Sequence, residues 1–437
     1  VTPASTGPIL KFINDSRRSG IGYCTMESNA SVSTNPIIQF GATTGNYGND
    51  SLLVDSCLFK NSTGTNPGAY FTAIGSTGTS AGIQKNSSIA IINSNFTGWL
   101  ANSTGIIDFS AASMGDSLIV DSNRVYNNIT MTATWSAIKL TGNGNNCTAN
   151  FNSIGGSNPD RSGSPILCLT GVTMIGIDVK SGNTIKSDVH GNIIANLCNM
   201  APRTLTSGIT KGINIQGGRL NVGTLVGNTI GGKANVWDTV TSAYDNGWID
   251  VTTASVTDTI LIWNNTISYA NYWRKRNDRN AGINIAGTSG AYIDVYNNNV
   301  NNMKGNGTGN SNSFQNFGIR LANTGANSVV NVRNNNINTM LHTGDTVITN
   351  NIHEPVGIIF GAGIATQTVN IFNNKIYDIQ SNANSAIDTG STAPIVSGIK
   401  LFSASSTLNV YNNSISLATQ NGTQTRVIGI YQGGTST

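Results

Sequence analysis

Short stretches in which apolar and polar residues alternate recur along the whole chain, and most end in a pair of polar residues. The clearest copies read apolar-x-apolar-x-Asn-Asn-x-apolar, with the second asparagine at positions 265, 298, 335, 374 and 413. Weaker copies centre on Ser56, Ser94, Asn123, Asn152, Asn192 and Asn228. From position 56 to position 413 the mean spacing over ten intervals is about 36 residues. Alternation with a period of two predicts short β-strands that each bury one face.

A second phrase, Gly-Ile-x-apolar, precedes the first at a nearly constant distance. Its glycines are Gly176, Gly212, Gly282, Gly318 and Gly398. Each lies 15 to 17 residues before the second residue of the following polar pair. Both phrases therefore belong to one repeat unit, and the longer insertions fall mostly after the Asn-Asn phrase.

One unit is too short to bury its own apolar face, whereas stacked units bury a continuous core. Two short strands for every 36 residues, with a possible third around 300–303, leave no length for helices between them. We therefore predict an all-β solenoid of about eleven or twelve coils that covers residues 1–437 as a single domain. Asparagine tolerates left-handed backbone angles, so the Asn-Asn pair predicts the bend between strands. Its side chains can also form a hydrogen-bonded ladder from coil to coil.

The composition agrees with this interpretation. The 437 residues include 62 Asn and 50 Gly, while only 10% are charged. Such a chain favours turns and strands over helices. The net charge of +4 is small for this length, so we expect no nucleic-acid partner. No apolar run approaches 18 residues, so we expect no membrane span.

The cysteines and histidines predict no metal centre. Cys24, Cys57, Cys147, Cys168 and Cys198 form no Cys-x-x-Cys pair, and buried free thiols are the expected state. The three histidines are isolated in the sequence, and clustered carboxylates for calcium are not evident. We therefore expect neither a cofactor nor a metal.

The repeat over roughly residues 36–431 resembles the coil of right-handed parallel β-helix proteins, the pectin-lyase-like superfamily. That family includes polysaccharide lyases and hydrolases, phage tailspikes and long bacterial surface proteins. The Asn-, Thr- and Gly-rich, weakly charged character looks most like the bacterial surface proteins. The resemblance implies a right-handed coil and an extracellular or cell-surface location.

In the enzymes of this superfamily the catalytic residues project outward from one sheet. The corresponding outward column of the Gly-Ile strands reads Gln39, Asp108, Lys139, Asp178, Asn214, Asp250, Asn284, Arg320, Ile359, Lys400 and Tyr431. Asp178 and Asp250 lie two coils apart, at roughly 9–10 Å, close to the upper limit for the two carboxylates of an inverting glycosidase. Trp248-Ile249-Asp250 is similar to a pectate lyase signature, but Val251 replaces the expected histidine and the polygalacturonase signatures are missing. We therefore keep an enzyme as the alternative and assign no catalytic residue.

A second outward column stands directly before the Asn-Asn pairs and holds Trp263, Tyr296, Arg333, Phe372 and Tyr411. Stacked aromatic side chains of this kind are typical of a binding face for sugar rings or for another protein. The alternative is that the rings cover one another and a long loop covers them all. Asn331, Asn370 and Asn409 form a polar column beside them.

One basic cluster interrupts the weakly charged chain. Arg274, Lys275 and Arg276 lie in the insertion before Gly282, with Arg279 close by. We expect this loop to contact an acidic polysaccharide or a neighbouring copy of the chain, or simply to be solvated.

These observations favour a non-enzymatic structural or adhesive solenoid of a bacterial surface or extracellular filament. Its expected partners are surface glycans or further copies of itself. Gly429-Ile430-Tyr431 begins another coil just before the last residue, so we expect a segment of a longer repeat protein or a stacking subunit. The alternatives are a polysaccharide lyase or hydrolase that acts on the Gly-Ile face, and a tailspike-like glycan-binding protein.

Overall fold

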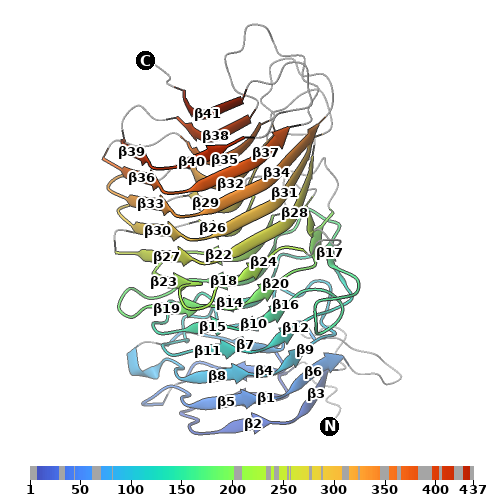
Figure 1. The fold of residues 1–437 in the computed structure, drawn as a ribbon. Helices are drawn as coiled ribbons and strands as arrows, with labels where there is room; N and C mark the ends of the chain where they lie inside the picture. The colour runs from blue at the N-terminus through green and yellow to red at the C-terminus, as the bar shows by residue number, and fades with distance from the viewer. Residues whose placement is uncertain are drawn as a thin grey trace.

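The computed structural model describes most of the chain. The described residues are 7–28, 35–43, 45–61, 70–80, 82–200, 209–232, 238–240, 246–252, 255, 257–274, 278–286, 289–307, 314–322, 325–344, 354–361, 366–381, 396–402, 406–417 and 427–433. They form three long parallel sheets in which every strand pairs with strands of the neighbouring turns. Figure 1 shows the turns piled on one another from the N-terminal strands at the bottom to the C-terminal strands at the top.

The Gly-Ile phrases form the first sheet, which has thirteen strands. In order they are β1 (Leu10–Phe12), β4 (Ile38–Phe40), β7 (Ile74–Ser76), β10 (Gly105–Asp108), β14 (Trp135–Leu140), β18 (Met174–Val179), β22 (Thr210–Ile215), β26 (Asn246–Val251), β29 (Asp278–Ala286), β32 (Phe314–Ala322), β35 (Glu354–Phe360), β38 (Val396–Leu401) and β41 (Val427–Gln432).

The strands that precede the polar pairs form the second sheet, which has twelve. They are β2 (Gly20–Gly22), β5 (Leu52–Asp55), β8 (Ile89–Ile92), β11 (Ile119–Asp121), β15 (Thr148–Asn150), β19 (Ser187–Val189), β23 (Arg219–Val222), β27 (Thr259–Trp263), β30 (Tyr292–Tyr296), β33 (Val329–Arg333), β36 (Thr368–Phe372) and β39 (Thr407–Tyr411).

The strands that follow the polar pairs form the third sheet. They are β3 (Thr25–Ser28), β6 (Leu58–Asn61), β9 (Asn95–Phe96), β12 (Arg124–Val125), β16 (Ser153–Ile154), β20 (Ile193–Ile194), β24 (Thr229–Ile230), β28 (Thr266–Arg274), β31 (Asn299–Gly307), β34 (Asn336–Gly344), β37 (Lys375–Ser381) and β40 (Ser414–Ser416). In the N-terminal half this sheet continues through a separate short strand in four turns, namely β13 (Thr130–Met131), β17 (Ile166–Cys168), β21 (Leu197–Asn199) and β25 (Asp238–Val240). A single 3-10 turn, Gly82–Gln84, is the one helical element of the described residues.

The fold class is therefore the predicted all-β parallel solenoid, and the possible third strand at 300–303 is part of β31. The count of eleven or twelve coils is wrong, since the first sheet alone holds thirteen strands. The count began at Ser56, but β2 and β3 already form a turn before it. Ser56 is also one residue too early, because Leu58 pairs with Asn95 and Cys57 therefore lies beside Ser94.

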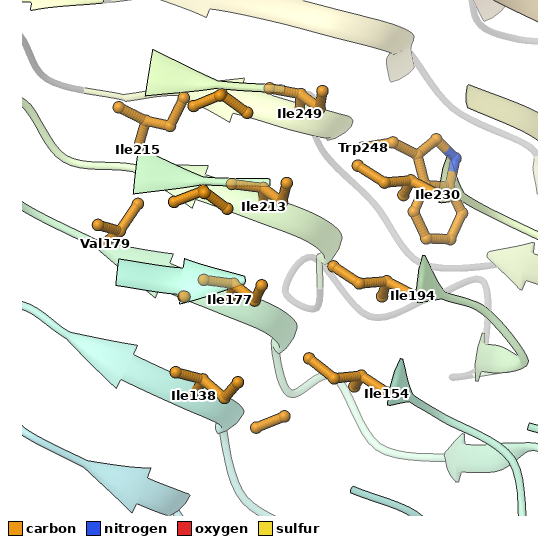
Figure 2. Close-up of a cluster of buried hydrophobic side chains, with 14 of the residues drawn as sticks. Ile138, Ile154, Ile177, Val179, Ile194, Ile213, Ile215, Ile230, Trp248 and Ile249 are labelled. Carbon is orange, nitrogen blue, oxygen red and sulfur yellow. The ribbon is translucent and has the colours of Figure 1, made fainter. Parts of the chain in front are cut away.

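Stacked isoleucines and valines fill the interior. In Figure 2, Ile138, Ile177, Ile213 and Ile249 of the first sheet form one column. Ile154, Ile194 and Ile230 of the third sheet form the column that faces it. All seven side chains are fully buried. Each turn thus repeats the same apolar layer, which is how a short amphipathic unit buries its apolar face.

The facing columns explain the glycine of the Gly-Ile phrase. A Cβ on Gly212 would lie 2.3 Å from the Cγ2 of Ile230, and a Cβ on Gly318 would lie 2.5 Å from the Cγ2 of Ile337. The side chain that follows each polar pair therefore packs directly onto the glycine backbone of its own repeat. In these repeats glycine leaves room for this contact, whereas other turns have Ile106, Ala137 or Trp248 at the same register position.

The polar pair forms the corner between the second and third sheets. The first residue has a left-handed backbone, with φ near 55° at Asn264, Asn297, Asn334, Asn373 and Asn412. The second residue points inward and builds the predicted ladder. In each rung the Oδ1 accepts the backbone N–H and the side-chain Nδ2–H of the preceding turn's asparagine, as Asn335 does from Asn298 at 2.9 and 2.9 Å. The ladder runs through Asn123, Asn152, Asn192, Asn228, Asn265, Asn298, Asn335, Asn374 and Asn413.

Candidate binding site

The five residues of the predicted aromatic stripe, Trp263, Tyr296, Arg333, Phe372 and Tyr411, are direct register partners in successive turns. They stand at the carboxyl ends of β27, β30, β33, β36 and β39. All five are partly accessible to solvent, and Tyr411 is 48% exposed. The register of this column is therefore the predicted one, and its side chains are not completely covered.

Ring contacts connect most of the stripe. The rings of Trp263 and Tyr296 meet edge to face at 5.5 Å, and those of Phe372 and Tyr411 stack at 4.9 Å with an interplanar angle of 6°. Between the two pairs, the guanidinium carbon of Arg333 lies 4.1 Å from the centre of the Tyr296 ring. The stripe is therefore an ordered surface in which each side chain limits the freedom of its neighbour.

A buried carboxylate, which the sequence analysis did not single out, holds the stripe from beside it. Asp294 accepts hydrogen bonds from the Nε and Nη2 of Arg333 at 2.9 and 2.8 Å, and from the Nε1 of Trp263 at 3.1 Å. The hydrogen bonds that Arg333 donates to Asp294 raise the pKa of Arg333. Asp294 is the register partner of Asn331. Extending the Asn331, Asn370 and Asn409 column by one turn would have revealed it.

That asparagine column forms a second, outer ladder. The Nδ2 of Asn370 donates to the Oδ1 of Asn331 at 2.7 Å, and the Nδ2 of Asn409 donates to the Oδ1 of Asn370 at 2.8 Å. The Nδ2 of Asn331 donates to the hydroxyl of Tyr292 at 3.1 Å. The column stacks as predicted and forms a polar border along the stripe.

On the other border of the stripe, at the corner to the third sheet, lies a pocket of about 540 Å³. It is lined by Asn297, Asn334, Asn336, Asn373, Lys375 and Tyr377, and the buried ladder residue Asn335 completes the lining. Tyr296, Arg333 and Phe372 each directly precede one of the corner asparagines. The pocket therefore lies next to the middle three turns of the stripe.

The outward column of the Gly-Ile strands has the predicted register except that it also includes Gly75, between Gln39 and Asp108, and it is mostly buried. Asp178 is 4% exposed and Asp250 is 2% exposed. The Oδ1 of Asp178 accepts from the Nδ2 of Asn214 and the Nε2 of Gln216, both at 2.7 Å. Lys211 connects Asp178 and its partners to Asp250. Its Nζ donates to the Oδ1 of Asn214 at 2.9 Å and pairs with the carboxylate of Asp250 at 2.7 Å.

The network extends further along the column. The Oδ1 of Asp250 accepts from the Nδ2 of Asn284 at 2.8 Å, and the Oδ1 of Asn284 accepts from Arg320 at 3.4 Å. Burial raises the pKa of Asp178 and outweighs the hydrogen bonds from Asn214 and Gln216, which lower it. Asp178 and Asp250 are thus bound into one buried network, and neither lines an open groove.

Three candidate features remain, namely the basic cluster, the histidines and a metal site. Lys275 and Arg276 lie outside the described residues, and so does the side chain of Arg274 at the end of β28. His190 is not isolated, because its Nε2 lies 3.3 Å from the Oδ1 of Asp188. Among the described residues, no three His, Cys, Asp or Glu side chains are grouped closely enough to hold a metal ion.

Three parallel sheets, an internal asparagine ladder and repeated apolar layers define this chain as a parallel β-solenoid. Comparisons with protein-family models, with curated proteins and with solved structures found no match for it. The part of the chain that the structure describes has no helix with the length and hydropathy of a membrane span.

Proposed function

We propose that this protein is a non-enzymatic, extracellular solenoid of a bacterial surface or filament that binds glycans along the aromatic stripe. The observation that carries the proposal is the stripe itself: five register-matched side chains, four of them aromatic, that stay partly exposed over consecutive turns. Aromatic faces beside hydrogen-bonding groups suit sugar rings, which have apolar faces and hydroxyl edges.

The surroundings of the stripe support a glycan over an apolar protein partner. On one side, next to Arg333, Phe372 and Tyr411, lies the outer asparagine ladder, and on the other lies the amide-lined pocket, so polar groups border this part of the stripe on both sides. Amides both donate and accept hydrogen bonds, as sugar hydroxyls do. Repetition of the same groups in each turn also matches the repeating units of a polysaccharide.

The burial of Asp178 and Asp250 favours a binding role over hydrolysis. A general acid and a general base must each reach the reacting atoms of a substrate. Here both carboxylates are buried and accept hydrogen bonds from neighbouring side chains, Asp178 from Asn214 and Gln216, and Asp250 from Asn284 beside its ion pair with Lys211. We infer that this network stabilises the outer face of the first sheet.

The test is binding to an array of immobilised neutral and acidic oligosaccharides. Tyr411→Ala is expected to weaken binding roughly 2- to 12-fold, because one aromatic contact contributes about 0.5–1.5 kcal/mol. Tyr47→Ala is the matched control, since Tyr47 is 46% exposed but lies outside the stripe. Equal losses in both variants would contradict the proposal. Release of reducing ends by the wild-type chain that disappears in Asp250→Asn would establish the enzyme alternative instead.

A further inference from the structure

The corner asparagines have different hydrogen-bonding roles along the solenoid. The Nδ2 of Asn297 donates to the Oδ1 of Asn264 at 2.7 Å, which closes the corner between those two turns. Among the described residues no such bond joins the side chains of Asn297, Asn334 and Asn373, although all three are exposed and adjacent in the stack. The amides of Asn334 and Asn373 line the pocket with donors and acceptors that remain free for a ligand, whereas the Nδ2 of Asn297 is already bonded to Asn264.

A single cation lines the same pocket. Lys375 projects outward from β37, is exposed, and pairs with no carboxylate of the described residues. Arg333, the nearest cation of the stripe, is already bound in a bidentate pair to Asp294. The ammonium group of Lys375 is therefore the charge that this surface can offer to a bound anion.

An aromatic ring completes the pocket. Tyr377 follows Lys375 by two residues, so both side chains project from the same face of β37, while Ile376 between them is buried in the core. The Tyr377 side chain is 40% exposed. Its ring gives the pocket an apolar surface beside the amides and the ammonium group.

We propose that this pocket binds one acidic pyranose unit, a sugar ring that carries a carboxylate, of a glycan lying along the stripe. In this arrangement the ring packs on Tyr377, its hydroxyls bond the amides of Asn334 and Asn373, and its carboxylate pairs with Lys375. Successive turns repeat at about 4.8 Å, so the amides of Asn334 and Asn373 can contact different groups of one sugar ring. This inference rests on the proposed glycan-binding function and adds the class of sugar.

The experiment is calorimetric titration with tetramers of mannuronic, glucuronic and galacturonic acid, each beside the neutral hexose tetramer of the same linkage. We expect at least one acidic tetramer to bind more tightly than its neutral counterpart. Lys375→Met should weaken that binding about tenfold and leave the neutral tetramer unchanged, because it removes one charge-assisted contact. Lys186→Met, which removes another exposed lysine outside the pocket, should change neither.

A second variant tests the amides without straining the backbone. Asn334 has a φ of 56°, so Asn334→Gly keeps the corner conformation and removes only the side chain. It should weaken both tetramers of the pair, since hydroxyl contacts are common to both. Higher salt should weaken the acidic tetramer in the wild type and have little effect in Lys375→Met.

Three results would overturn the assignment. They are equal wild-type affinity within every acidic and neutral pair, an equal effect of Lys375→Met on both members, and failure of all the acidic tetramers to bind. If neutral oligosaccharides still bind and Tyr411→Ala weakens them, the proposed function stands and only the acidic pocket fails. If no oligosaccharide binds on the array either, both proposals fail.

Discussion

Asp294 and Arg333, 39 residues apart in the chain, form a bidentate ion pair across adjacent turns, with N–O distances of 2.9 and 2.8 Å. The Asp294 side chain is 2% exposed, whereas that of Arg333 is 29% exposed. The buried carboxylate therefore fixes a partly exposed cation over the ring of Tyr296. The ion pair therefore fixes Arg333 in the middle of the stripe, while Asp294 itself adds no exposed group to the surface.

Replacing Asp294 should test that role. Asp294→Ala is expected to lower the free energy of unfolding by about 3 kcal/mol, because it leaves the guanidinium and the indole N–H of Trp263 without their acceptor. Chemical denaturation measures the change. Asn331→Ala, the same column position one turn on, keeps the carboxylate and should cost much less. A cost of Asp294→Ala no greater than that of Asn331→Ala would contradict the assigned role.

Substitution of an inner-ladder asparagine should lower the stability of the fold far more than substitution of the corner residue beside it. The Asn298 side chain donates to the backbone O of Ile262 and to Asn335, and its Oδ1 accepts twice from Asn265. Asn298→Ala would leave buried groups without partners and should cost at least about 3 kcal/mol. Asn297→Gly, at a φ of 55°, should stay within about 0.5 kcal/mol. Urea unfolding of the two variants decides, and similar midpoints would refute the ladder's role.

The cost of replacing a repeat glycine with alanine should depend on the atoms that face that glycine. A Cβ at Gly318 would lie 2.5 Å from Ile337 Cγ2 and 2.6 Å from the backbone O of Gly357, so Gly318→Ala should cost about 1–3 kcal/mol. At Gly429, in the same repeat position, a Cβ would meet no atom within 4 Å, and Gly429→Ala should be nearly neutral. Thermal unfolding of both variants provides the comparison. A stable Gly318→Ala protein would show that the facing isoleucine can move aside.

Asp178 should make the fold less stable as its carboxyl ionises. Its folded-state pKa is raised by burial, so the unfolded chain loses the proton first, at a pH of about 4. Its contribution to stability is therefore favourable in acid and falls as pH rises from there through the raised pKa. Asp178→Asn removes this dependence, so the stability of the variant relative to wild type should increase between pH 3.5 and neutral pH. Unfolding curves across that range measure it, and a difference independent of pH would contradict the raised pKa.

The thiols should react very unequally. Cys24 is exposed, while the other four cysteines are buried. Burial also raises the pKa of Cys147 to about 11, which leaves little thiolate at pH 8. Iodoacetamide at pH 8 should therefore label Cys24 alone in the folded protein and all five cysteines in denaturant. Rapid labelling of Cys147 in the native protein would contradict the burial of its thiol.

The sequence by itself determined the solenoid, the register of most of its turns and the members of the stripe, but it misplaced the turn at Ser56 by one residue. It could do so because strands stacked in register repeat the same pattern in each turn, and position 263 of one turn implies position 296 of the next. Only the tertiary structure decided which outward columns are accessible. Asp178 and Tyr411 both point away from the core, yet the first is buried in a polar network and the second is half exposed. The ion pair between Asp294 and Arg333 and the pocket beside Lys375 also required the structure. Each brings together side chains from different columns, and the repeat pattern does not show which columns lie in contact.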